Sequence, residues 1–146
     1  MVPADEDAAI KKTIPVVCAV IEQGPAILAA LRGPDQSNAG LWEFPGGKVR
    51  QGETTEAALL RELQEELMLN EVSILTPLTP CRHAYPWITI ELIPFLCVLT
   101  KGEPCPREHA AIRWVRLDEA ATLAWAPADL PVLAEYGRLK QDRRSP

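Results

Sequence analysis

The sequence predicts an α/β fold of one domain, in which β-strands alternate with two substantial helices. Residues 87–100 form the strongest β run, and residues 15–22 are a second apolar run of strand length. Helical patterns occur at residues 54–70 and 130–140. Because strands interleaved with helices pack as layers, we expect an α/β or α+β sandwich.

The remaining elements follow from turn residues and from short apolar runs. Prolines at positions 77, 80 and 86 interrupt residues 72–84, so any strand there is an edge strand or is broken. Further strands are expected at residues 26–31, 41–44 and 111–117, a short helix at 118–123, and loops at 32–40 and 101–107. We therefore expect a single domain at residues 13–141, an N-terminal tail at 1–12 and a C-terminal tail at 142–146.

The composition limits the classes of partner. The chain has 146 residues, of which 47% are hydrophobic and 24% charged, and its net charge of −5 argues against binding a nucleic-acid polymer. No apolar run approaches the ~18 residues of a membrane span, and the four cysteines lack C-x-x-C spacing. These features predict a cytoplasmic protein without a membrane partner. They leave a monomer and a homodimer equally open.

The helix at residues 54–70 is unusually rich in carboxylates. At about 100° per residue, Glu62, Glu65 and Glu66 fall on one side of it. Crowded like charges destabilise a helix, so this cluster requires compensating cations. Arg61 can neutralise one charge, and carboxylate oxygens suit a hard divalent ion, Mg²⁺ or Mn²⁺. The neighbouring face carries a stripe that is expected to pack on the core, formed by Leu59, Leu60, Leu63 and Leu67.

The spacing of these residues extends into the glycine-rich segment before the helix. Gly47 is followed after five residues by Glu53 and, after seven more, by Arg61-Glu62-Leu63-Gln64-Glu65-Glu66. This pattern resembles the Nudix box of nucleoside-diphosphate hydrolases. The resemblance implies an α/β/α sandwich around a mixed sheet, with this loop and helix as the catalytic element.

One position departs from the family pattern. The family usually has glycine where this chain has Met68, and glycine there suits a left-handed helix cap. Asn70 tolerates that conformation, so we expect the helix to end near Leu69 or Asn70. No charge is lost at this position, so the departure affects the helix end and leaves the chemistry intact.

Two flanking segments resemble the MutT and CTP-pyrophosphohydrolase branch of the family. They are residues 39–49, which include Glu43-Phe44-Pro45-Gly46-Gly47, and residues 126–133. The resemblance implies hydrolysis of a nucleoside triphosphate to a monophosphate and pyrophosphate. Modified or damaged nucleotides, of the 8-oxo-dGTP or CTP and 5-substituted dCTP type, are the expected substrates.

The resemblance also assigns roles to individual residues. Glu53 and Arg61 resemble the pair that locks the loop against the helix, and Glu108 resembles a late glutamate that holds metal or positions water. The expected catalytic residues are Glu53, Arg61, Glu62, Glu65, Glu66 and Glu108. The expected metal ligands are Gly46, Gly47, Glu62, Glu65, Glu66 and Glu108. The expected substrate-binding residues are Arg32, Ser37, Glu43, Phe44, Lys48 and Asp129, with Arg32 and Lys48 on the phosphates.

The nucleobase is the least determined part of the substrate. An ionised Asp129 only accepts hydrogen bonds, which favours a cytosine or (oxo)guanine base; its alternative role is to cap the final helix. Tyr85 and Trp87 are aromatic residues near an expected hairpin tip, for which packing is preferred over base stacking. Two other functions stay open: an ADP-sugar or dinucleoside-polyphosphate hydrolase, and a non-catalytic nucleotide sensor of the same fold.

Overall fold

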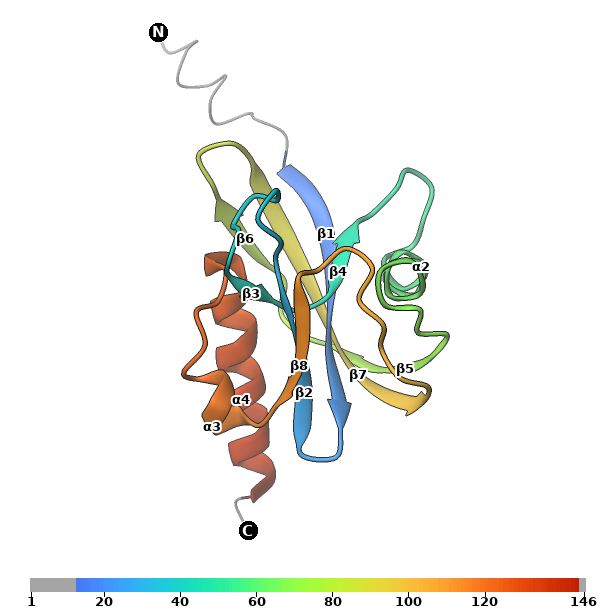
Figure 1. Cartoon of the computed structure of the whole chain (residues 1–146), viewed down its shortest axis with the longest axis vertical. Helices are drawn as coiled ribbons and strands as arrows, with labels where there is room; N and C mark the ends of the chain where they lie inside the picture. Colours follow the sequence, from blue (N-terminus) through green and yellow to red (C-terminus); the bar gives the residue numbers. More distant parts are fainter. Residues whose placement is uncertain (1–12, 145–146) are drawn as a thin grey trace, which may run out of the picture.

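The computed structural model describes residues 13–144, and it is built around one mixed sheet (Figure 1). The predicted N-terminal tail and residues 145–146 lie outside the described part of the chain. The strands are β1 (Thr13–Gln23), β2 (Ala26–Leu31), β3 (Trp42–Glu43), β4 (Gly46–Lys48), β5 (Glu71–Pro77), β6 (Cys81–Ala84), β7 (Thr89–Lys101) and β8 (Ala111–Val115). The helices are α2 (Thr55–Leu67), α3 (Leu117–Ala120), the 3₁₀ turn η1 (Pro127–Asp129) and α4 (Leu130–Arg144).

The sheet is organised around β1 and β7, which run parallel to each other. The main path of strands is β3-β2-β1-β7-β5; β4 pairs with β1, β6 with β7, and β8 with β2. Apart from β1 with β7, these pairings are antiparallel, so the sheet is mixed as expected.

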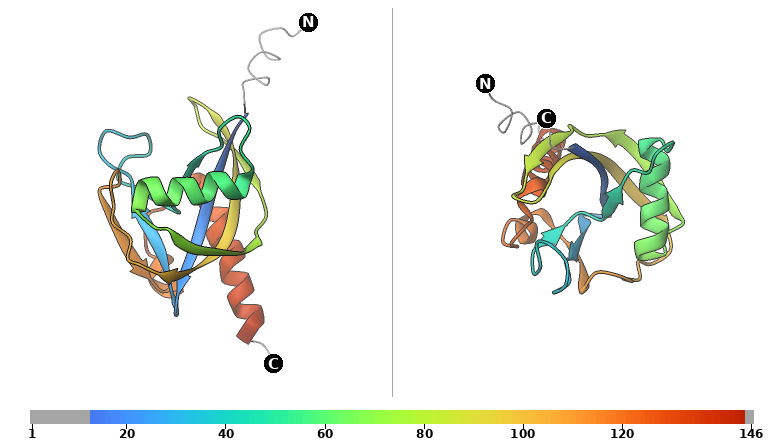
Figure 2. Two further views of the ribbon diagram at one scale, coloured as in Figure 1. Left: turned by 90° about the vertical axis from the view of Figure 1, so that its right-hand side faces the viewer. Right: turned by 90° about the horizontal axis from the view of Figure 1, so that it is seen from above.

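Each face of the sheet is covered by a helix, which explains why β1 is apolar on both sides. Val17 and Ala19 pack in a cluster with Leu59 of α2, whereas Cys18 and Val20 pack in a second cluster that includes Val132 of α4. Successive side chains of a strand point to opposite faces, so a doubly covered strand reads as a continuous apolar run. Figure 2 shows α2 and α4 on opposite sides of the sheet. The predicted α/β/α sandwich is confirmed.

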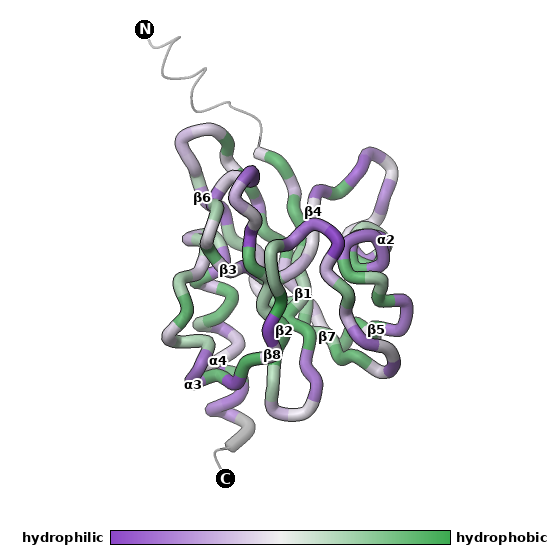
Figure 3. The backbone as a smooth tube through the Cα atoms, viewed as in Figure 1, coloured by the Kyte–Doolittle hydropathy of each residue, from purple (hydrophilic) through white to green (hydrophobic). Residues whose placement is uncertain are grey.

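The distribution of hydrophilic and hydrophobic residues follows this layered arrangement. Figure 3 shows hydrophobic residues along the central strands and hydrophilic residues in the loop between β4 and α2. Within residues 13–144, none of the helices combines the length and the apolar character that crossing a bilayer requires.

Most predicted elements are confirmed, with differences at specific boundaries. The interrupted segment 72–84 becomes two short strands, β5 and β6, both paired with β7. Gly46–Lys48 was expected in a loop but forms β4, because Gly47 pairs with Val17 of β1. The final helix continues to Arg144, beyond the predicted end at Lys140. Leu60 is 43% exposed, so its assignment to the buried stripe of the helix is wrong.

The end of α2 also differs from the prediction. The helix ends at Leu67, and Met68 itself adopts the left-handed conformation (φ 57°, ψ 31°) while its N–H hydrogen-bonds to carbonyls of the last turn. The expected end at Leu69 or Asn70 is therefore wrong. The reason is that Leu69 is buried in the core, and the chain must turn at Met68 to bring it there.

We expect Met68→Gly to stabilise the protein. A left-handed conformation costs a non-glycine residue ~1–2 kcal/mol, and substitution by glycine removes this cost. Because glycine loses more conformational entropy on folding, only part of that free energy appears as stabilisation. Met68 is 52% exposed, so little packing is lost. The melting temperature should rise by ~2–4 °C. Met68→Ala, which keeps the Cβ atom, should bring no such gain. A lower melting temperature for the glycine variant would contradict a cost of the left-handed conformation at Met68.

Candidate active site

The site begins with the loop that leads into α2. Thr54 is the N-cap of the helix, and its hydroxyl accepts a hydrogen bond from the N–H of Ala57 at 3.1 Å. Immediately before it, Glu53 Oε1 accepts a hydrogen bond from the N–H of Arg50 at 2.8 Å. These two contacts stabilise the turn and the first helical N–H groups, and they hold Glu53 beside the helix.

Arg61 joins this loop to the helix. Its guanidinium donates to both carboxylate oxygens of Glu53, at 2.6 and 2.9 Å, and to the carbonyl of Lys48 at 3.0 Å. Its third nitrogen donates to Glu62 at 2.8 Å and to Glu65 at 3.2 Å. Hydrogen bonds from Arg61 lower the pKa of Glu53 to about 2, and the same contact raises the pKa of Arg61. Both groups are therefore charged near neutral pH.

Two glycines allow the strand before this loop to lie close to the site. A Cβ atom on Gly46 would stand 1.9 Å from the carbonyl oxygen of Val17, and one on Gly47 would stand 2.3 Å from the carboxyl carbon of Glu62. No larger residue fits either position without displacing its neighbour. Glycine at position 47 thus creates the space that the Glu62 carboxylate occupies.

Glu66 is the most perturbed carboxylate of the helix. Burial, followed by the charges of Glu62, Glu43 and Glu108, raises its pKa to about 9. A hydrogen bond with the Gly46 backbone opposes this rise. Its Oε1 atom is buried without a hydrogen-bond partner among the described residues. A buried carboxylate oxygen without a partner is costly, and a bound cation is one way to satisfy it.

The predicted metal ligands are only partly brought together. The charges of Glu62 and Glu108 act on Glu66, whereas Glu65 is half exposed and paired with Arg61 and, at 3.8 Å, with Arg50. Among residues 13–144, no three His, Cys, Asp or Glu side chains stand close enough together to form a preformed metal site.

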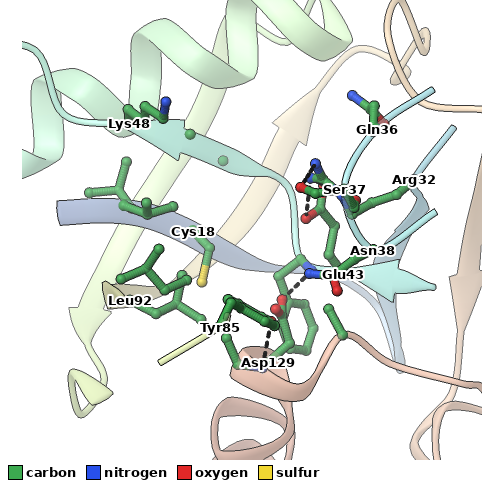
Figure 4. A pocket seen from close by; sticks show the side chains of 18 of the residues that line it. Cys18, Arg32, Gln36, Ser37, Asn38, Glu43, Lys48, Tyr85, Leu92 and Asp129 are labelled. Atoms are coloured by element: carbon green, nitrogen blue, oxygen red, sulfur yellow. Dashed lines mark hydrogen bonds and ion pairs between the residues drawn. The ribbon is translucent and has the colours of Figure 1, made fainter. Parts of the chain in front are cut away.

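A cavity of about 630 Å³ includes members of this acidic group in its wall. Glu66, Glu108 and Lys48 line one part of it, and Asp129 and Phe44 line another. Figure 4 shows Arg32, Glu43 and Asp129 around this pocket. Of the predicted site residues, the cavity wall includes Arg32, Ser37, Glu43, Phe44, Gly46, Gly47, Lys48, Glu66, Glu108 and Asp129.

Arg32 occupies the pocket as part of a network of side chains. Its guanidinium donates to both oxygens of Glu43, at 2.9 and 3.1 Å, and to the carbonyl and hydroxyl oxygens of Ser37. His109 lies on the other side of Glu43, with Nε2 2.8 Å from Oε2. His109 was not predicted as a site residue from the sequence, where its only signal is its position next to Glu108.

Asp129 lies at the opposite end of the pocket and is buried. Its Oδ2 atom accepts a hydrogen bond from the N–H of Phe44 at 2.8 Å, so the side chain tethers the residue that follows β3 to η1. Burial, with the charge of Glu43, raises its pKa well above the usual value, so the neutral acid is favoured. The prediction of an ionised Asp129 took no account of this burial. A neutral carboxyl both donates and accepts hydrogen bonds.

The aromatic hairpin residues also lie on the pocket. The Tyr85 hydroxyl accepts a hydrogen bond from the N–H of Ala128 at 3.0 Å, next to Asp129. Trp87 stacks on the Tyr85 ring with centroids 4.9 Å apart, and it is 54% exposed. Both rings line the cavity, and the preference for packing over base stacking stays a prediction for both.

The Glu53–Arg61 contact predicts how stability depends on pH. Because the folded pKa of Glu53, about 2, is below its ordinary value of 4.5, this carboxylate stabilises the fold above pH ~4.5. The contribution is lost as pH falls from ~4.5 toward ~2. We expect the melting-temperature difference between the wild type and Glu53→Gln to be largest above pH ~5 and to vanish near pH 2.

The control for this measurement is Glu56→Gln on the same helix. Glu56 is exposed, and its carboxylate accepts a hydrogen bond from the hydroxyl of Thr55. Its substitution should cause a smaller difference at every pH. A Glu53→Gln difference that does not depend on pH would contradict the role of the Arg61 contact.

Comparison with known proteins agrees with this architecture. The family model described as NUDIX domain matches residues 12–136. The CTP pyrophosphohydrolase of Escherichia coli (strain K12) is 36% identical over 132 residues, covering 90% of this chain and 97% of its own. The 8-oxo-dGTP diphosphatase of the same organism is 33% identical over 135 residues, covering 89% and 100%.

Solved structures show the same fold. The solution structure of the E. coli ORF135 protein superposes with a TM-score of 0.79 at 34% identity, covering 94% of this chain and 98% of that one. The crystal structure of the MutT NUDIX hydrolase from Burkholderia pseudomallei gives a TM-score of 0.75 at 27% identity, covering 86% and 98%. With the box residues gathered around one helix and loop, the chain belongs to the Nudix hydrolase family.

Proposed function

We propose that the protein is a metal-dependent nucleoside triphosphate pyrophosphohydrolase that releases a nucleoside monophosphate and pyrophosphate. The observation that carries this proposal is Glu66, a carboxylate with one unpartnered buried oxygen, on the wall of a large cavity and close to Glu62 and Glu108. The relatives named for CTP and for 8-oxo-dGTP support a nucleotide substrate.

The acidic group has the chemistry of a site for a hard divalent cation. Glu62, Glu66 and Glu108 would hold Mg²⁺ or Mn²⁺, with Glu65 and the carbonyls of Gly46 and Gly47 as further candidate ligands. When bound, such an ion neutralises phosphate charge and makes bound water more acidic. Arg61 orients Glu62, because its guanidinium holds one oxygen of that carboxylate at 2.8 Å.

Two basic residues suit the phosphates of the substrate. Lys48 lines the cavity on the same strand as Gly46 and Gly47, and Arg32 lines it from the end of β2. The Arg32 guanidinium is planar, and its orientation is set by both Glu43 oxygens. A phosphate between these side chains and a cation held at Glu66 would face positive charge on both sides.

The nucleobase fits the end of the cavity that Asp129 and Phe44 line. A neutral Asp129 carboxyl can donate and accept, so it suits a base edge that offers both kinds of group, such as cytosine or (oxo)guanine. An ADP-sugar or dinucleoside-polyphosphate hydrolase and a non-catalytic sensor are the alternatives. A release assay across nucleotides with Mg²⁺ separates all three.

We expect Glu66→Gln to lower kcat at least a hundredfold, equivalent to ~2.7 kcal/mol of transition-state stabilisation. The amide keeps the shape of the side chain but binds a cation poorly. Chelation of metal by EDTA should abolish wild-type hydrolysis, and added Mg²⁺ or Mn²⁺ should restore it. Phosphate release after coupling to a pyrophosphatase measures both effects.

Two controls separate an effect of Glu66→Gln on catalysis from an effect on folding. Glu56→Gln removes a carboxylate from the exposed first turn of the same helix and should leave kcat unchanged. Without metal, Glu66→Gln should unfold at a temperature no lower than the wild type, because a pKa of about 9 already leaves Glu66 uncharged near neutral pH and the amide keeps its shape. Full activity of the variant, or full activity of the wild type in chelator, would refute the metal assignment.

We expect Asp129→Ala to change base preference more than Asp129→Asn does. An amide, like a neutral carboxyl, can accept from Phe44 and still offer a donor, whereas alanine leaves the Phe44 N–H unpaired. The ratios of kcat/KM among dCTP, 5-substituted dCTP, 8-oxo-dGTP and dTTP should shift by about tenfold or more in the alanine variant.

A loss of kcat/KM that is the same for every nucleotide would contradict base recognition by Asp129. If both variants lower kcat/KM equally for all four nucleotides, or if only the melting temperature falls, Asp129 is a structural tether between Phe44 and η1. Base recognition would then depend on other residues of the cavity wall.

A further inference from the structure

His109 is a buried side chain of the pocket to which neither the box nor the proposed reaction assigns a role. Its side chain is 2% exposed, and Nε2 lies 2.8 Å from Glu43 Oε2. Its Nδ1 atom is buried without a hydrogen-bond partner in the described part of the chain. The ring is anchored from the main chain as well, since the next residue, Ala110, donates its N–H to the carbonyl of Leu31 at 2.9 Å.

The contacts of Glu43 explain what this ring does. Arg32 donates from one nitrogen to Oε1 and Oε2 of the Glu43 carboxylate, and His109 contacts only Oε2. A carboxylate accepts hydrogen bonds, so Nε2 of His109 carries a proton and donates it. The buried ring cannot turn away, and it therefore fixes the plane of the carboxylate. The plane of the carboxylate in turn fixes the direction of the Arg32 guanidinium.

We propose that His109 is a positioning residue that, by holding Glu43, fixes the guanidinium of Arg32 for contact with the substrate phosphates. This inference rests on the proposed function, because it assigns Arg32 to the phosphates. Arginine has a long side chain with high rotational freedom, so an arginine held in advance loses less entropy when a phosphate binds. Loss of the His109 contact should therefore raise KM more than it lowers kcat.

A double-mutant cycle tests this connection. The variants are His109→Leu, Arg32→Ala and the two combined, assayed for kcat/KM with dCTP and Mg²⁺. We expect His109→Leu to lower kcat/KM about tenfold, mainly through KM. If His109 acts through Arg32, the combined variant should be no worse than Arg32→Ala alone, since residues in one network are not additive.

Two further variants distinguish positioning from a general loss of structure. In His109→Gln the amide nitrogen can take the place of Nε2 and donate to Glu43, so kcat/KM should return to within about threefold of the wild type. Tyr136→Phe removes a different buried hydrogen bond, from the Tyr136 hydroxyl to Glu22 at 2.6 Å, outside the pocket. It should lower the melting temperature without changing KM.

The outcomes that would contradict the role of His109 differ from those that would contradict the proposed function. Additive losses in the combined variant, or a glutamine variant no better than leucine, would overturn the positioning role of His109. If the wild type hydrolyses no nucleoside triphosphate, the proposed function fails. In that case the dissociation constant of dCTP is measured for the same set of variants. Additive losses of affinity in the combined variant would then overturn the inference.

Discussion

The fork of hydrogen bonds between Arg61 and Glu53 is the interaction on which the site depends. It ties the loop after β4 to the middle of α2, and the same guanidinium reaches Glu62, Glu65 and the carbonyl of Lys48. The Arg61 guanidinium thus holds three carboxylates, of Glu53, Glu62 and Glu65, that would otherwise repel one another. Burial of the neighbouring face of α2 against the sheet, through Leu59, Leu63 and Leu67, keeps the acidic side turned toward the loop.

Local patterns in the sequence predicted strands that alternate with two helices, whereas the α/β/α sandwich and the catalytic loop–helix unit were implied by the resemblance to the Nudix box. Strand β2 has its predicted bounds, and Thr54 caps the helix. The end of α2 could not be predicted in the same way. Residue preferences favoured Asn70 for the left-handed position, but burial of Leu69 requires the turn at Met68, and core packing outweighs the local preference.

The parts of the site that the sequence did not predict are set by long-range contacts. His109 meets Glu43 across 66 positions of the chain, and Asp129 meets Phe44 across 85. Neither spacing is periodic, so a motif does not reveal the pair. The ionisation of Asp129 is harder still to predict, because its raised pKa results mainly from burial, a property of the folded chain.

Glu43 connects the two ends of the cavity electrostatically. Its charge contributes to the raised pKa of Glu66 at the acidic end and of Asp129 at the opposite end. Arg32 and His109 both contact Glu43, so the balance of charge in the pocket depends on this group of three side chains. A phosphate that contacts Arg32 while Glu43 holds the guanidinium would share the positive charge of Arg32 with Glu43. Both Glu66 and Asp129 would then experience more of the negative charge of Glu43, which raises their pKa values further.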